Sequence, residues 1–342
     1  MNLADALSST VAGRPLTRLE AHGVFAAALG PEHDPAQLAG FLTALAVRGE
    51  SADVIAGAVD ALRAAMLPFE HDCPDAIDTC GTGGDGLGTF NLSTASAIVA
   101  AAAGAHVVKH GNRAASSRCG SADLLEAAGL RLDLTPRGAR DVLEEVGITF
   151  LFAPRYHPAL RHAAAVRRAL GVRTVFNLLG PLVNPGRPRR QLLGLGDGSK
   201  LDVVAEVLEA LEVEHALVVH GAGGADELTL EGENRVRSVG ARAGPAPRLD
   251  ARALGLAPAP VSALAGGDAA ANLSLLRALL SGERGPLADA LRLNTCAALL
   301  VAGLESDPHA ALQRAGDALD SGAAADLFER WIDCSARAEA SA

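Results

Sequence analysis

The first seventy residues carry apolar positions at helical spacing and none of the strict alternation that marks a half-buried strand. Between residues 38 and 45, apolar side chains recur at intervals of three and four, which places them on one face of a helix. Thr17 and Glu20 form a T-x-x-E capping box before an earlier helix, and Ser51 stands where it can cap a later one. This part of the chain is therefore predicted to be all-helical.

After Asp75 the pattern changes to short apolar runs that alternate with helical stretches. Such alternation is typical of βαβ units and a mainly parallel sheet, whose ligands bind at the carboxyl ends of the strands. The fold class predicted is therefore α/β, with a small all-helical domain and a large α/β domain around a central, mainly parallel sheet. The expected strands are 76–80, 105–109, 148–152, 191–196 and 215–221, and the expected helices are 94–103, 122–128, 136–146, 201–211 and 287–303. A further helix over 157–170 is compatible with packing on either part.

Composition narrows the class of protein. Of the 342 residues, 49% are hydrophobic, which supports a sizeable core, while a net charge of -10 and 3% aromatics argue against a nucleic-acid partner. The five cysteines contain no C-x-x-C spacing and suggest reduced thiols. No secretory signal is visible, and the most apolar stretch, 95–108, is too short to span a membrane. A soluble, cytoplasmic protein is expected.

The stretch "GTGGDGLGTFNLST", Gly81 to Thr94, follows the first expected strand and contains G-x-G-x-x-G. A dinucleotide site is disfavoured for two reasons. The loop does not open directly into a helix, and the acidic residue that such sites carry about twenty positions later is missing. The absence of a Gly-Lys-Ser/Thr run excludes a Walker A loop. A phosphate site is favoured instead, since glycines expose backbone N–H groups and Ser93 and Thr94 stand at the expected start of a helix. A flexible turn without a ligand, with Thr94 as a simple N-cap, is the plainer alternative.

A second loop, "KHGNRAASSRCGSADLLEAAG" from Lys109 to Gly129, follows the next expected strand. It offers Lys109, Arg113 and Arg118 beside small hydrogen-bond donors, and Ser121 is expected to cap the helix that follows. Cations beside such donors suit a polyphosphate, whereas any one of them alone would be read as a solvated surface charge.

Two further segments carry candidate chemistry. Asp226 and Glu227 are adjacent carboxylates just beyond an expected strand. Paired oxygen ligands suit Mg²⁺ that also bridges substrate phosphates. The alternative is an exposed acidic pair that binds no metal. In the segment 156–185, Arg167 or Arg168 is a candidate to bind a carboxylate through two N–H groups of its guanidinium. Helical periodicity does not decide between the two arginines, because the position of the helix relative to the cleft is not known.

Taken together, these motifs resemble those of the anthranilate phosphoribosyltransferases of tryptophan biosynthesis. The resemblance runs over nearly the whole chain and is carried by both loops, by "FLFAPRYHPAL", "VRRALGVRTVFNLLGPLVNP" and the Asp226–Glu227 pair, and by the late "GPLADALRLNTCAALLVAG". It implies a small helical domain over 1–72, and the segment of about 157–188 returns to this domain. The small domain would form the dimer interface and the acceptor side of the site. It also implies a large α/β domain over 73–156 and 189–342 that binds the phosphoribosyl donor, and a homodimer.

The resemblance also implies roles for individual residues. Ser93 would hold one Mg²⁺, and Asp226 with Glu227 a second. The acceptor side would comprise Gly81, Asn112, His157, Arg167 and Pro181. The donor, 5-phosphoribosyl 1-diphosphate, would be surrounded by Gly81, Gly84, Asp85, Thr89, Asn91, Leu92, Ser93, Thr94, Lys109, His110, Gly111, Asn112, Arg113, Ala114, Ala115, Ser116, Ser117 and Ser121.

The activity implied is transfer of the phosphoribosyl group to anthranilate by a Mg-dependent glycosyltransferase, giving N-(5-phosphoribosyl)anthranilate and diphosphate. An arylamine is already neutral at pH 7, so no acid or base residue is assigned, and Lys109 and Arg167 are expected to act by electrostatics and positioning. Two alternatives remain at this point. One is an enzyme like the pyrimidine nucleoside phosphorylases, which has no diphosphate leaving group, and the other is a non-catalytic nucleic-acid-binding relative of the same fold.

Overall fold

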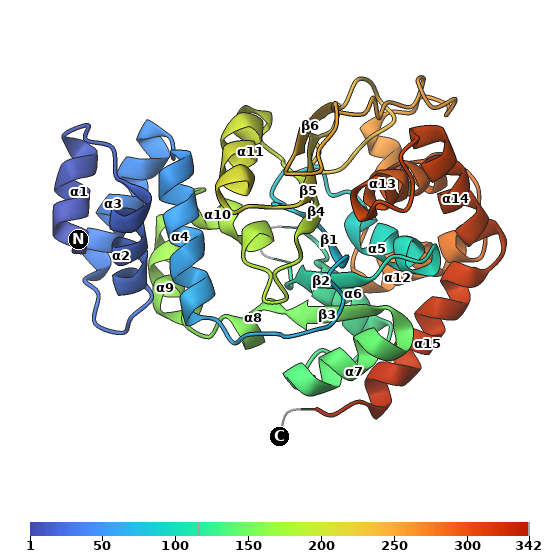
Figure 1. Ribbon diagram of the computed structural model, residues 1–342, viewed down its shortest axis with the longest axis horizontal. Helices are drawn as coiled ribbons and strands as arrows, with labels where there is room; N and C mark the ends of the chain where they lie inside the picture. The colour runs from blue at the N-terminus through green and yellow to red at the C-terminus, as the bar shows by residue number, and fades with distance from the viewer. Residues whose placement is uncertain (115–116, 341–342) are drawn as a thin grey trace.

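The computed structural model describes residues 1–114 and 117–340. Its N-terminal part is a helical bundle, seen on the left of Figure 1. The Thr17–Glu20 capping box predicted from the sequence is present, and Ser51 caps the fourth helix. The helices of the bundle are α1 (Leu3–Val11), α2 (Arg18–Ala28), α3 (Pro35–Arg48) and α4 (Ala52–Ala65).

The segment that follows the third strand returns to this bundle. Its helices are α8 (Ala153–Tyr156), α9 (Leu160–Leu170) and α10 (Phe176–Leu179), followed by the 3₁₀ turn η1 (Gly180–Leu182). Helix α9 packs on α3 and α10 on α4, and side chains of both segments share one hydrophobic cluster. The helix expected over 157–170 begins later, at Leu160, because His157 has non-helical backbone angles (φ −120°, ψ 58°) and ends the short helix α8.

The remaining chain is built on one six-stranded sheet in the order β3-β2-β1-β4-β5-β6. The first five strands are parallel, as expected, and lie within two residues of their expected bounds. The sixth strand pairs antiparallel to β5 and was not predicted. The bounds are β1 (Ile77–Gly81), β2 (Val107–Gly111), β3 (Ile148–Phe152), β4 (Arg190–Gly194), β5 (His215–His220) and β6 (Arg235–Val239).

Helices cover both faces of the sheet, and alternate strand residues enter different clusters. Leu192 and Leu217 pack into the larger core beside α5 and α13, whereas Leu193 and Val218 pack into the cluster shared with α11 and the bundle. The helices are α5 (Leu92–Ala102), α6 (Ser121–Ala127), α7 (Pro136–Val146), α11 (Leu201–Ala210), α12 (Ala269–Leu280), α13 (Pro286–Ala302), α14 (Pro308–Asp320) and α15 (Ala323–Arg337), with 3₁₀ turns η2 (Gly198–Lys200) and η3 (Val261–Leu264).

The strand order fixes the position of the site. Strand β1 lies between β2 and β4, so its carboxyl end is the point at which the order of connections reverses, where ligands of such sheets bind. The glycine loop leaves β1 there, and the second loop leaves β2 beside it. None of the described helices is long and apolar enough to cross a membrane.

Candidate active site

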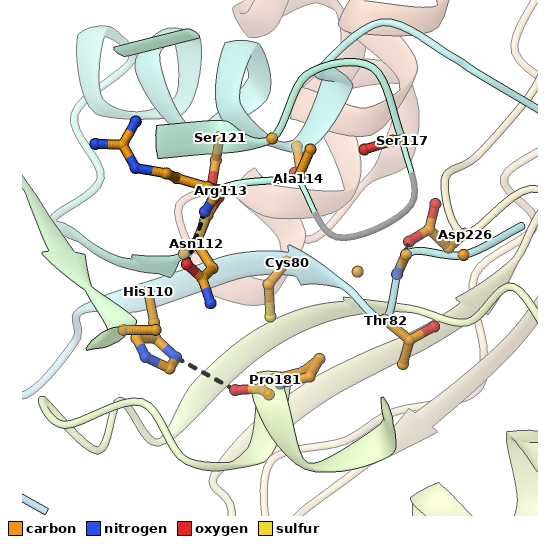
Figure 2. Close-up of a pocket in the computed structure, with 18 of the residues that line it drawn as sticks. Cys80, Thr82, His110, Asn112, Arg113, Ala114, Ser117, Ser121, Pro181 and Asp226 are labelled. Atoms are coloured by element: carbon orange, nitrogen blue, oxygen red, sulfur yellow. Dashed lines mark hydrogen bonds between the residues drawn. The ribbon is translucent and has the colours of Figure 1, made fainter. Parts of the chain in front are cut away.

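A cavity of about 390 Å³ opens at the carboxyl ends of β1 and β2. Its walls come from the glycine loop, the second loop and the Asp226–Glu227 segment on one side, and from α9, α10 and η1 on the other. Figure 2 shows Asp226 and Thr82 at one end of this space and His110 and Asn112 at the other, with Pro181 between them. Residues of the helical bundle and of the α/β part therefore line the same cavity.

The glycine loop is tied to the acidic pair through backbone N–H groups. Asp226 Oδ2 accepts a hydrogen bond from the backbone N–H of Gly83 (2.6 Å), and Glu227 Oε1 accepts one from the N–H of Ser93 (2.9 Å). A Cβ at Gly81 would lie 2.2 Å from Asp226 Oδ2, so glycine is required there for the close approach. The loop and the carboxylates, about 140 residues apart in the sequence, thus form one structure.

The start of α5 differs in detail from the expectation. Asn91, not Thr94, is the N-cap, and it makes no side-chain cap hydrogen bond. Thr94 is buried, and its hydroxyl has no partner among the described residues. Leu92 is fully buried and does not line the cavity. The N–H of Ser93 donates to the acidic pair, whereas the N–H groups of Leu92 and Thr94 donate to the carbonyls of Phe90 and Asn91. Ser93 and Thr94 both line the cavity, so the start of α5 borders it, as expected of a phosphate or metal site.

The two carboxylates are poised for a cation. Burial raises the pKa of Glu227 to about 8, with a further contribution from the Asp226 charge, and burial together with the Asp85 charge raises the pKa of Asp226. A cation bound beside two such carboxylates favours their ionised form and so counteracts the rise in their pKa values that burial causes. No group of three or more described His, Cys, Asp or Glu side chains forms a complete metal site. This donor set fits Mg²⁺, which commonly takes one or two carboxylates and completes its shell with water and substrate phosphates.

Lys109 lies beneath the same region, with 1% of its surface exposed. Its ammonium group donates to the carbonyl of Thr79 (2.5 Å) and lies 3.5 Å from Ser93 Oγ. The nearby Asp78 is fully buried; burial raises its pKa, while the Lys109 charge and a hydrogen bond from Asn184 Nδ2 (2.8 Å) act in the opposite direction. Sequence reasoning assigned no role to Asp78 or Asn184. Asp78 lies inside an expected buried strand, and although Asn184 lies in a segment that carries the resemblance, its contact with Asp78 depends on tertiary packing.

The second loop lines the cavity mainly with backbone and small side chains. Asn112 and Ser117 face it, while Ala115 and Ser116, which were also expected to bind the donor, lie outside the described residues. Arg113 departs from the simple expectation. Its guanidinium pairs with Glu126 and Asp123 and lies over the ring of Phe152, and Figure 2 shows it directed away from Asp226.

Ser121 was expected to cap the helix after this loop, but Gly120 is the N-cap and Ser121 is the first helical residue. The Ser121 hydroxyl instead donates to the carbonyl of Asn112 (3.3 Å). The residue still lines the cavity. The cap was misplaced by one residue, because serine is common at the N-cap and the sequence does not show that the helix already includes Ser121.

On the acceptor side, the break between α8 and α9 brings His157 and Arg167 to one cavity although they do not share a line on one helix. Arg167 lies over the ring of Phe176, with 4.9 Å between its Cζ and the ring centroid, and makes no hydrogen bond or ion pair to any described residue. Burial lowers its pKa. Arg168 is exposed and does not line the cavity, so the structure resolves the choice that the sequence left open.

Two histidines face each other at this end. The rings of His110 and His157 are 5.1 Å apart, and His110 Nδ1 lies 3.2 Å from the carbonyl oxygen of Gly180. Burial lowers the pKa values of His110 and His157, to about 3 and about 4 respectively, so both rings are neutral near pH 7. Pro181 follows Gly180 in the same wall, and its carbonyl accepts from Gln191 Nε2 (2.5 Å). The result, among the described residues, is a largely apolar slot that is bounded by two neutral imidazoles and the Arg167 guanidinium, and it suits a planar aromatic carboxylate.

The structure thus places most of the predicted residues that it describes around one cavity. The exceptions are Leu92, which is buried, and Arg118, which is exposed and does not line the cavity. The structure adds Thr82, Phe176, Asn177 and Leu179 to the lining. Outside the lining, Arg173 donates from Nη1 to the carbonyl of Gly84 (2.7 Å) and from Nη2 to that of Gly83 (3.3 Å). Arg173 joins the acceptor segment to the glycine loop, a contact for which the sequence carries no spacing signal.

Comparison with known proteins supports a common family. A family model described as "Glycosyl transferase family, a/b domain" matches residues 73–325, and one described as "Glycosyl transferase family, helical bundle domain" matches residues 4–66. The anthranilate phosphoribosyltransferase of Chloroflexus aggregans is 48% identical to this chain, over 97% of this chain and 98% of that protein.

Solved structures agree with this match. The anthranilate phosphoribosyltransferase of Thermus thermophilus is 46% identical and superposes with a TM-score of 0.91 over 97% of this chain and 99% of that chain. The Saccharomyces cerevisiae enzyme, solved in complex with PRPP and Mg, is 25% identical with a TM-score of 0.88 over 98% of both chains. The chain described here belongs to the anthranilate phosphoribosyltransferase family.

Proposed function

We propose that this protein transfers the 5-phosphoribosyl group from 5-phosphoribosyl 1-diphosphate to anthranilate, giving N-(5-phosphoribosyl)anthranilate and diphosphate in tryptophan biosynthesis. The observation that carries the proposal is the single cavity in which two phosphate-type loops and an acidic pair face an apolar slot with one unpaired guanidinium. The family relationship gives independent support.

The donor is assigned to the two loops. Their N–H groups and the buried charge of Lys109 would stabilise the negative charge that develops on the departing diphosphate, which is the main catalytic demand of this reaction. Asp226 and Glu227 would hold Mg²⁺, and Ser93 is assigned to a second ion. When bound, the metal would neutralise diphosphate charge and orient the donor. The yeast relative solved with PRPP and Mg supports the use of this ion.

The acceptor is assigned to the slot formed by His157, Pro181 and Phe176. Arg167 would bind the anthranilate carboxylate and Asn112 would help to orient the amine. Because the amine is neutral at pH 7, its lone pair is available for attack at ribose C1 without a strong base. Alignment of the two substrates by opposite walls of one cavity would supply the remaining rate enhancement.

We further propose that residues 1–72 with 157–188 form the acceptor-side domain and that 73–156 with 189–342 form the donor domain. A homodimer through the small domain is supported by an apolar groove on α1 and α3, at which Val11 and Val47 are 70% and 83% exposed. A cytoplasmic location is supported by the five cysteines, which form no disulfide.

The test is a fluorescence assay that follows the loss of anthranilate in the presence of the donor and Mg²⁺. We expect turnover that needs both substrates and stops when EDTA removes the metal. Phosphate-dependent cleavage of a pyrimidine nucleoside, without any need for Mg²⁺, would instead support the phosphorylase alternative. Absence of anthranilate consumption by the folded, Mg²⁺-supplied protein would rule out the proposed activity.

A further inference from the structure

The second loop has a narrow neck where its two limbs lie against each other. Asn112 and Ala114 are on the first limb, and Gly120 and Ser121 on the second, and all four line the cavity. A Cβ at Gly120 would lie 2.4 Å from the backbone nitrogen of Ala114 and 2.7 Å from the carbonyl oxygen of Asn112. The limbs are therefore in direct backbone contact, which only glycine allows at this point.

One carboxylate oxygen joins the limbs. Asp123 Oδ2 accepts hydrogen bonds from the N–H of Ala114 (2.8 Å) and from the N–H of Gly120 (2.9 Å), while Oδ1 lies 3.3 Å from Arg113 Nη1. Partial burial acts to raise the pKa of Asp123, but these backbone N–H groups and Arg113 outweigh it and lower the pKa overall. Asp123 therefore stays ionised near neutral pH, as a strong acceptor for both N–H groups.

Asp123 is the third residue of α6, and the hydrogen bond that it accepts from the N-cap residue Gly120 also caps this helix. The apolar face of α6 anchors the helix in addition. Ala122, Leu124 and Leu125 of α6 are fully buried in the hydrophobic core. Asp123 is instead turned toward the loop, where its carboxylate meets Arg113, Ala114 and Gly120. Its position in the first turn of the helix adds a favourable interaction with the helix dipole.

We propose that Asp123 is a positioning residue that fixes the two limbs of the second loop at the spacing the donor diphosphate requires. The inference rests on the proposed function. Because these limbs offer mostly backbone N–H groups and small side chains, their affinity for a polyphosphate depends on where the backbone lies. The N–H groups of Ala114 and Gly120 are taken up by Asp123 itself. The carboxylate therefore controls donor binding by holding the backbone of the two limbs in place, and it touches no substrate.

Glu126 provides a matched control on the same helix. It pairs with the Arg113 guanidinium at the exposed side, and no described backbone N–H donates to it from either limb. A role that consisted only of neutralising Arg113 would therefore be shared by Glu126 and Asp123. A role in fixing the limbs belongs to Asp123 alone.

The experiment compares wild type with Asp123→Ala, Asp123→Asn and Glu126→Gln in steady-state kinetics and thermal unfolding. For Asp123→Ala we expect the donor KM to rise at least about tenfold, equivalent to ~1.4 kcal/mol, with the anthranilate KM within about twofold. Asp123→Asn keeps one oxygen at the neck and should recover part of the loss. Glu126→Gln should leave the donor KM within about twofold of wild type.

Hydrogen exchange supplies a readout that needs no activity. Peptides that contain the amides of Ala114 or Gly120 should exchange faster in Asp123→Ala than in wild type, and unchanged exchange would overturn the proposal. Equal rises in both KM values, or a donor KM for Glu126→Gln as high as for Asp123→Ala, would also overturn it. Failure of the proposed function is separate, because wild type itself would then not consume anthranilate. Should the alanine variant fail to fold, Asp123→Asn carries the same comparisons.

Discussion

The Arg167→Ala substitution is expected to weaken anthranilate binding without affecting the donor. Arg167 lies over Phe176, 4.9 Å from the ring centroid, and has no hydrogen-bond or ion-pair partner among the described residues. The alanine variant therefore loses contact with the acceptor carboxylate and breaks no other described polar contact. Hydrogen bonds to charged groups contribute about 1.5–3 kcal/mol, so at ~1.4 kcal/mol per factor of ten the anthranilate KM should rise roughly 10- to 100-fold.

The assay follows anthranilate fluorescence at saturating donor and Mg²⁺, and then varies the donor at high anthranilate. Arg168→Ala is the matched control, because this neighbour is exposed and does not line the cavity; its kinetic constants should remain near those of wild type. Arg167→Lys should recover little, since an ammonium cannot form the two-pronged contact of a guanidinium. A rise in the donor KM instead of the anthranilate KM would refute the assignment, as would equal effects in the two alanine variants.

Three further predictions concern the metal, pH and stability. Asp226→Asn should lower the apparent Mg²⁺ affinity at least about tenfold, ~1.4 kcal/mol, in a titration of activity against Mg²⁺; an unchanged titration curve would remove Asp226 from the metal site. Burial lowers the pKa values of His110 and His157 from 6.5 to about 3 and about 4, so the unfolded chain binds protons that the folded chain does not, and the free energy of unfolding should fall as pH drops from 6.5 toward 4. Thermal unfolding across this range measures the effect, and His157→Gln should flatten the profile, whereas an equally steep profile would contradict the reasoning. Asn184→Ala removes a hydrogen bond to the buried Asp78 carboxylate and should cost about 1.5–3 kcal/mol in urea unfolding; a loss below about 0.5 kcal/mol, within the range usual for surface changes, would mean that this bond is not stabilising.

The main elements of the α/β part could be predicted because their signals are local. The expected strand 148–152 and the expected helix 136–146 coincide with β3 (Ile148–Phe152) and α7 (Pro136–Val146), and the structure shows that Thr135 caps α7 and Gly147 ends it. Strand β6 could not be found in this way. Its sequence, RVRSV, has only two apolar residues among polar and charged ones at the edge of the sheet, so it forms no apolar run. Its pairing with β5 depends on a loop of 14 residues that carries no hairpin signal.

The site could be predicted as a set of motifs but not as an arrangement. The strand-end rule placed Lys109 and the glycine loop near each other, because both follow parallel strands. That Asp226 and Glu227 bind the N–H groups of Gly83 and Ser93 depends on tertiary packing across most of the sheet. The same holds for Arg167, since helical periodicity is unchanged by rotation about the helix axis and only the packed helix shows which arginine faces the cavity.

Joint binding of one diphosphate by both loops is the central claim, and a crystal structure with 5-phosphoribosyl 1-diphosphate and Mg²⁺ tests it directly. We predict that the diphosphate lies between the N–H groups of residues 83–94 and those of residues 111–121, with a metal ion in contact with Asp226 or Glu227. A donor bound elsewhere, or bound between these loops with no metal contact to either carboxylate, would contradict this claim.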